Sequence, residues 1–179
     1  TSEMSHTIRE ALQASVAAVE KRIAARPTLG LVLGSGLGAF GDTLSGLTKI
    51  PYAEIPHLPA STVVGHAGNL CFGKVGDIDV VCMQGRVHLY EGHPMSAVVH
   101  GVRLMAKLGV KTVLLTNAAG GLIPEWAAGD LMLVTDHLNL MGQNPLTGPN
   151  DDTLGPRFPD MTQAYDAALA AALRGVAKK

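Results

Sequence analysis

Apolar side chains recur along the chain at two different spacings. Near the N-terminus they fall on one side of a helix, with polar residues on the other side. The apolar positions of this stripe are Ile8, Leu12, Val16, Val19 and Ile23. We expect this helix to end near Pro27, because the residue before a proline avoids the α region. A second stripe predicts a helix from Pro94 to Leu108 that stops at Gly109.

Short apolar runs bounded by turn residues predict strands. These runs span residues 29–33, 69–75, 79–83, 110–116 and 131–135. The second and third flank Gly76-Asp77, as the two strands of a hairpin do. A final helix capped by Thr162 runs to about Lys178. Strands interspersed with helices predict an α/β fold, a central mixed β-sheet flanked by helices, in a single domain over residues 1–179.

Three of the predicted strands end in segments of unusual composition. The segments are Gly34-Ser35-Gly36, Gly85-Arg86-Val87-His88-Leu89-Tyr90 and Asn117-Ala118-Ala119-Gly120. In open α/β sheets, ligands bind beyond the carboxyl ends of the strands. The sequence therefore predicts one binding site built from three loops.

The first loop has the composition of an anion site. Glycines let backbone N–H groups converge on an anion, and Ser35 adds a hydroxyl donor. The alternative is a tight strand-to-helix turn that binds no ligand. The glycine spacing differs from the dinucleotide fingerprint, and no Lys-Ser/Thr pair follows as in a P-loop.

The second loop alternates Arg86, His88 and Tyr90, which share one side of an extended segment. The arginine has a planar fork for phosphate oxygens, the histidine donates near neutral pH, and the tyrosine offers a flat apolar face for a sugar. The alternative is a solvated surface ribbon. His66 stands between glycines, where a lone histidine is most often incidental.

Small residues form the third loop, from Asn117 to Gly121, and suit a flat ring lying against backbone. Close packing of a helix on the sheet would select the same residues. No Asp, Glu and His cluster has metal-ligand spacing, so the expected phosphate is free orthophosphate bound without a metal. Glu91 and Asp136 are not obviously paired as the carboxylates of a glycosidase are.

Composition narrows the function classes further. The net charge of -1 gives no electrostatic support for nucleic-acid binding, and no apolar run approaches the length of a membrane span. No secretory signal is visible at the N-terminus. Cys71 and Cys82 have no metal spacing, so we expect buried thiols in strands of a cytoplasmic protein.

Further segments join the three loops in a collinear series that covers nearly the whole chain. The series includes Leu33-Gly34-Ser35-Gly36-Leu37-Gly38, Gly65-His66-Ala67-Gly68, Gly85-Arg86-Val87-His88-Leu89-Tyr90-Glu91-Gly92, Thr116-Asn117-Ala118-Ala119-Gly120-Gly121-Leu122, Asp136-His137, Gln143-Asn144-Pro145-Leu146 and Arg157-Phe158-Pro159. Together they resemble the trimeric purine nucleoside phosphorylases. The resemblance implies that fold, with phosphorolysis of purine nucleosides of the inosine and guanosine class, phosphate as co-substrate and no cofactor.

The resemblance also implies roles for particular residues. Arg86 and His88 would be catalytic, and the phosphate ligands would be Ser35, His66, Arg86, His88 and Ala118. The nucleoside would contact Tyr90, Ala118, Ala119, Gly120 and Phe158, with Phe158 reaching the site of a neighbouring subunit in a homotrimer.

Members of that family continue beyond the position of Lys179 and carry further purine-binding groups there. The resemblance therefore implies a domain that is incomplete at its C-terminus. The segment from His137 to Gln143 is shorter than in mammalian members, which favours a bacterial type. Three alternatives stay open: a methylthioadenosine phosphorylase, a non-catalytic nucleoside- or phosphate-binding fragment, and a nucleosidase that uses water.

Overall fold

The computed structural model describes residues 2–60 and 68–178, and the chain divides into two compact units. The first unit is Thr1–Ala118 and the second is Ala119–Lys179. The prediction of a single domain over residues 1–179 stays a prediction. None of the helices in the described ranges is long and apolar enough to cross a membrane.

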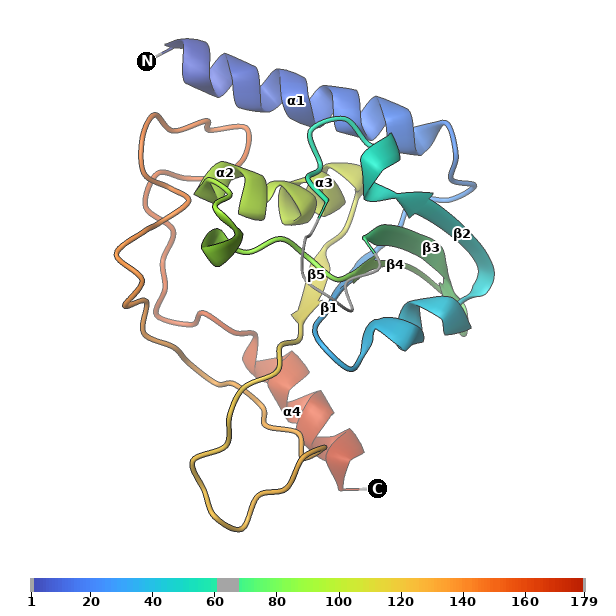
Figure 1. The fold of residues 1–179 in the computed structure, drawn as a ribbon, viewed down its shortest axis with the longest axis vertical. Coiled ribbons are helices and arrows are strands. Elements are labelled where there is room, and N and C mark those ends of the chain that lie inside the picture. Colours follow the sequence, from blue (N-terminus) through green and yellow to red (C-terminus); the bar gives the residue numbers. More distant parts are fainter. Residues whose placement is uncertain (1, 61–67, 179) are drawn as a thin grey trace. The chain divides into compact units, whose positions relative to one another are not determined.

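The first unit is built on a five-stranded mixed sheet in the order β2-β3-β4-β1-β5 (Figure 1). The strands are β1 (Leu29–Leu33), β2 (Ser45–Pro51), β3 (Asn69–Val75), β4 (Ile78–Gln84) and β5 (Thr112–Leu115). β1 pairs in parallel with β4 and β5, whereas β3 pairs antiparallel with β2 and β4. The predicted α/β fold with a mixed sheet is confirmed, and so is the hairpin of β3 and β4.

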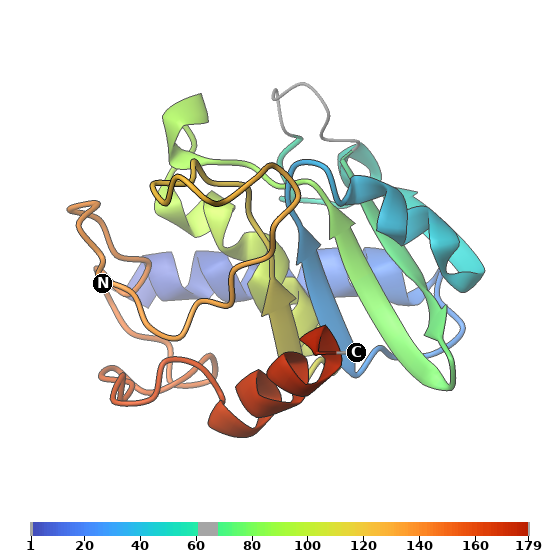
Figure 2. The ribbon, with the colours of Figure 1, turned by 90° about the horizontal axis from the view of Figure 1, so that it is seen from below.

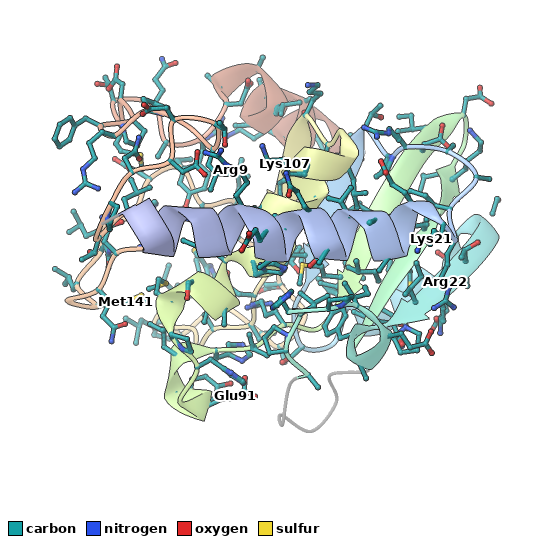
Figure 3. The ribbon with its side chains drawn as sticks, turned by 90° about the horizontal axis from the view of Figure 1, so that it is seen from above. Arg9, Lys21, Arg22, Glu91, Lys107 and Met141 are labelled. Carbon is teal, nitrogen blue, oxygen red and sulfur yellow. The ribbon has the colours of Figure 1, made fainter. Side chains whose placement is uncertain are left out.

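Helices lie on one face of this sheet. They are α1 (Ser2–Glu20), α2 (Met95–Val98) and α3 (His100–Leu108), and α1 packs on α3 (Figure 1). Glycines let α3 approach the strands closely: a Cβ at Gly30 would lie 2.9 Å from the Met105 sulfur, and one at Gly101 2.5 Å from the Met83 methyl. Arg22, labelled in Figure 3, lies just past the end of α1. It forms an ion pair with Glu54.

The 3-10 helix η1 (Gly38–Thr43) and the following residue, Leu44, pack on the opposite face of the sheet. A buried apolar cluster fills this layer: Leu31, Leu33, Leu44, Cys71, Val80 and Cys82. Both cysteines are free and buried, as predicted. Burial raises the pKa of Cys71 to about 11 and that of Cys82 to about 12, which keeps both thiols protonated and unreactive at neutral pH.

Three predicted helices differ from those observed. The first, α1, ends at Glu20, earlier than the end expected near Pro27. The helix expected from Pro94 to Leu108 is interrupted at Val99, whose φ of -89° and ψ of -4° leave the regular α-helical range and separate α2 from α3. The last helix, α4 (Ala167–Ala177), begins later than expected. Its cap is Asp166, whose carboxylate accepts a hydrogen bond from the Leu169 N–H, and not Thr162.

The strand predicted at residues 131–135 is wrong, because this segment is irregular in the second unit. A strand needs a neighbour for its backbone hydrogen bonds. α4 is the only regular element among the described residues of that unit, and Leu131 is 93% exposed. β2, by contrast, was missed: its burial pattern is mostly exposed, so it lacks the apolar run that marked the other strands.

A buried polar network ties α1 to α3. The Ser15 hydroxyl lies 2.6 Å from the Pro56 carbonyl oxygen and 2.8 Å from His100 Nε2. A hydroxyl has one proton, and the carbonyl can only accept it, so Nε2–H of His100 donates to Ser15. His100 is 6% exposed. Burial, together with the nearby His57 and Arg103, lowers the pKa of His100.

This network predicts that acid destabilises the first unit. The folded state holds His100 neutral, whereas the unfolded chain takes up a proton near the ordinary pKa of 6.5. The stability that comes from holding His100 neutral is therefore present above the ordinary pKa and is lost as the pH falls below it. The free energy of unfolding by urea is measured at about pH 7.5 and about pH 5.5. It should fall less for His100→Gln than for the wild type, because glutamine keeps an N–H donor for Ser15 and does not titrate. Equal losses in both proteins would contradict this role.

Candidate functional site

Three parallel strands of the first unit end at one edge of the sheet (Figure 2). β1 lies between β4 and β5, and the pairing of Leu33 with Gln84 and of Val32 with Leu115 brings their carboxyl ends level. The three segments singled out in the sequence follow these ends directly. The three segments therefore begin at one sheet edge, and the prediction that they form one binding site stays a prediction.

The first loop is a tight turn held against β5. The Leu37 N–H donates to the Gly34 carbonyl at 3.1 Å, and Gly36 has a φ of 86°, a conformation that favours glycine. A Cβ at Gly34 would lie 2.8 Å from the Thr116 carbonyl oxygen, so the two backbones approach as closely as glycine allows. Ser35 is exposed at the tip of this turn, where its hydroxyl can meet a ligand.

The second loop begins at Gly85, whose φ of 88° turns the chain away from β4. The buried Tyr52 hydroxyl donates to the Gly85 carbonyl at 2.6 Å and fixes this turn. Burial raises the pKa of Tyr52, so the phenol stays a donor at neutral pH. Arg86 follows, half-buried, and its Nη1 donates to the Thr116 carbonyl at 3.1 Å. The second loop is thereby bonded to the third.

Glu91 holds the conformation of the next turn, η3 (Leu89–Glu91). One of its carboxylate oxygens, Oε1, accepts the His88 backbone N–H and lies 2.8 Å from His88 Nδ1. The contact between Nδ1 and the carboxylate fixes the orientation of the His88 ring. The Tyr90 ring stacks on that of His88 at 4.7 Å between centroids and is 75% exposed. The pair presents a polar ring beside a flat apolar face.

β5 is followed by Thr116 and then by the third loop, whose first residues, Asn117 and Ala118, end the first unit. Ala118 is exposed, and the Asn117 side-chain amide donates to its carbonyl at 3.3 Å. Predicted site residues Ser35, Arg86, His88, Tyr90 and Ala118 therefore all belong to the loops at this edge. The arrangement offers a hydroxyl, a guanidinium and an imidazole, which suits an oxyanion.

The other predicted site residues are not among the described residues of the first unit. Ala119, Gly120 and Phe158 belong to the second unit, and His66 lies outside the described residues. Phe158 is 86% exposed, with the Arg157 guanidinium 5.9 Å from its ring centroid. A shallow hollow in the same unit is lined by Trp126, Asp130, Leu131 and Met132 and contains none of the predicted residues.

Gln84, the last residue of β4, was not predicted from the sequence and stabilises this edge of the sheet by hydrogen bonds. It is 3% exposed, and its side-chain Nε2 donates to the Gly38 carbonyl at 2.9 Å and to Asp42 at 3.0 Å. This joins the end of β4 to η1, the element that follows the first loop. A hydrogen bond from Lys49 and one from Gln84 lower the pKa of Asp42. The feature of the sequence that could have indicated this role is a polar glutamine at the end of an apolar strand, directly before Gly85.

Within residues 2–60 and 68–178, no group of three His, Cys, Asp or Glu side chains is placed to hold a metal ion. The three loops carry hydrogen-bond donors from which a ligand site can be built. Donors beyond the carboxyl ends of parallel strands are typical of the class of α/β proteins that bind ligands at this edge of the sheet.

Comparison with known proteins agrees with this class. Residues 28–179 match the family model of the phosphorylase superfamily, and the chain belongs to that superfamily. It is 46% identical over 171 residues to purine nucleoside phosphorylase 1 of Bacillus subtilis strain 168, covering 96% of this chain and 63% of that protein. It is 51% identical over 144 residues to the rat purine nucleoside phosphorylase, covering 79% of this chain and 50% of that protein.

A similar solved structure is that of the Schistosoma mansoni purine nucleoside phosphorylase in complex with inosine. Its TM-score is 0.85 at 38% identity, and the match covers 94% of this chain and 60% of that one. The chain thus spans 63% or less of the length of the relatives described here.

Proposed function

We propose that this protein is a purine nucleoside phosphorylase that converts inosine- and guanosine-class nucleosides and phosphate into free purine and ribose 1-phosphate. The observation that supports this most is the level ending of β4, β1 and β5, which gathers Ser35, Arg86 and His88 at one edge. Two relatives, 46% and 51% identical to this chain, are named purine nucleoside phosphorylases. The enzyme would be a pentosyltransferase of purine salvage.

In the proposed reaction, a phosphate oxygen bonds to the anomeric carbon as the glycosidic C–N bond breaks. The bond's electron pair leaves with the purine, which gains the proton that hydrogen phosphate gives up when it becomes the ester. Arg86 and His88 would neutralise and orient phosphate as the nucleophile, so that it attacks an oxocarbenium-like carbon from a fixed position. Ser35, His66 and the Ala118 backbone would complete the phosphate site.

The nucleoside would lie beside the phosphate. The exposed Tyr90 ring, stacked on His88, offers an apolar face to the ribose. Ala118, Ala119 and Gly120 would line the purine, since their small side chains let a flat ring reach the backbone. A solved relative bound to inosine and another bound to ribose 1-phosphate are consistent with these two ligands.

The proposal includes no cofactor, with phosphate as co-substrate. It places the protein in the cytoplasm, where the free thiols of Cys71 and Cys82 remain reduced. It also includes a homotrimer in which Phe158 completes the ribose site of a neighbouring subunit. The high exposure of Phe158 is compatible with such a contact.

Arg86→Ala should weaken phosphate use by about one to two decades and leave nucleoside binding nearly unchanged, because a charge-assisted bond is worth about 1.5–3 kcal/mol. Arg86→Lys should rescue poorly, since lysine lacks the planar fork. Arg174→Ala, on exposed α4, is the matched control. The measurement is inosine cleavage against phosphate concentration. Purine release by the wild type without phosphate would instead support a nucleosidase, and phosphate binding without turnover would support a non-catalytic fragment.

Phe158→Ala should impair ribose binding and spare phosphate affinity, and the shared site can be tested by complementation. Coexpressed Arg86→Ala and Phe158→Ala subunits should regain about a quarter of wild-type activity, because a site is intact when its own subunit keeps Arg86 and its neighbour keeps Phe158. Met161→Ala, exposed in the same segment, serves as the control for Phe158. Activity no greater than that of either variant alone would exclude a Phe158 that acts across subunits.

A further inference from the structure

Thr116 is the residue at which the three loops are bonded together. It directly follows β5 and is half-buried. Its hydroxyl donates to the Val32 carbonyl at 2.9 Å and accepts the Gly34 N–H at 2.8 Å. Its own carbonyl accepts Nη1 of Arg86 at 3.1 Å. One residue therefore contacts the last residues of β1, the start of the first loop and the arginine of the second.

These bonds depart from the regular pattern of a parallel ladder. The Thr116 N–H donates to the Val32 carbonyl at 3.0 Å, which continues the pairing of β1 with β5. The next regular bond would run from the Gly34 N–H to the Thr116 carbonyl. The Gly34 N–H instead donates to the Thr116 hydroxyl. The side chain replaces the backbone acceptor, and the carbonyl is left for Arg86.

The surroundings leave little room for another arrangement. Gly34 is buried, and a Cβ there would meet the Thr116 carbonyl and the Asn117 backbone below 3.0 Å. A buried N–H needs an acceptor. Without the hydroxyl, the acceptor that a regular parallel ladder offers to the Gly34 N–H is the Thr116 carbonyl, which already accepts a hydrogen bond from Arg86. The two donors would then compete for it.

We propose that Thr116 is a positioning residue for the phosphate site. Its hydroxyl takes the ladder bond of Gly34, which sets the turn bearing Ser35 and frees the carbonyl that orients Arg86. The proposal rests on the proposed function, since it assigns these two side chains to phosphate. It adds a residue that touches no substrate and acts through the two that do.

Thr116→Val tests the proposal because it keeps the shape of the side chain and removes only the hydroxyl. Thr116→Ser restores a hydroxyl on a smaller side chain. Thr112→Val is the matched control, because Thr112 is half-buried at the opposite end of the same strand. Binding of inorganic phosphate to each protein is measured by calorimetric titration, and the free energy of unfolding by urea.

We expect Thr116→Val to weaken phosphate binding roughly three- to tenfold, the size of one lost hydrogen bond. Thr116→Ser and Thr112→Val should stay within about twofold of the wild type, well below one such bond. If Thr116 had a purely structural role, its variants would lose phosphate affinity only in proportion to their loss of unfolding free energy. Thr116→Ser would then not restore phosphate binding beyond its gain in stability.

Three results would overturn the inference. If Thr116→Val binds phosphate as the wild type does, the hydroxyl does not position the site, and the proposed function is untouched. If the serine variant is as weak as the valine variant, the hydroxyl is not the cause. If the wild type itself binds no phosphate, the proposed function fails and the positioning role fails with it.

Discussion

The parallel pairing of β1 with β4 on one side and β5 on the other fixes the position of the proposed phosphate ligands. Each strand is followed at once by a loop, and the register makes the three loops start at the same level. Parallel strands place their carboxyl ends together by geometry alone. Ser35 and Arg86, 51 positions apart in the sequence, thus come to one sheet edge.

Close backbone approach and buried polar side chains turn this topology into a defined site. Gly34 lets β1 and the third loop meet at a distance that a side chain would prevent. The Tyr52 hydroxyl fixes the turn at Gly85, and Gln84 bonds the end of β4 to the element after the first loop. These donors and acceptors are satisfied within the first unit, so they stabilise the loops with little cost of desolvation. Loops held in this way can present preorganised donors to a ligand, which is what anion recognition requires.

Much of this architecture could be predicted from the sequence, because strand runs such as 29–33 and the glycine turns after them have strong local signals. What failed depended on tertiary context. β2 has a largely exposed pattern, and residues 131–135 have an apolar pattern but no strand beside them in the second unit. The roles of Thr116 and Gln84 could not be predicted, since each consists of hydrogen bonds to residues far along the chain. The placement of Ser35, Arg86 and His88 at one edge followed from the rule for parallel strands.

The most direct test of this account is a crystal structure of the protein grown with inorganic phosphate. The account predicts phosphate at the carboxyl ends of β4, β1 and β5, within hydrogen-bond distance of the Ser35 hydroxyl, the Arg86 guanidinium and the Ala118 N–H. Arg86 should keep its hydrogen bond to the Thr116 carbonyl. Phosphate bound at another surface, such as the loop around Arg157, with the sheet edge occupied only by water, would contradict it.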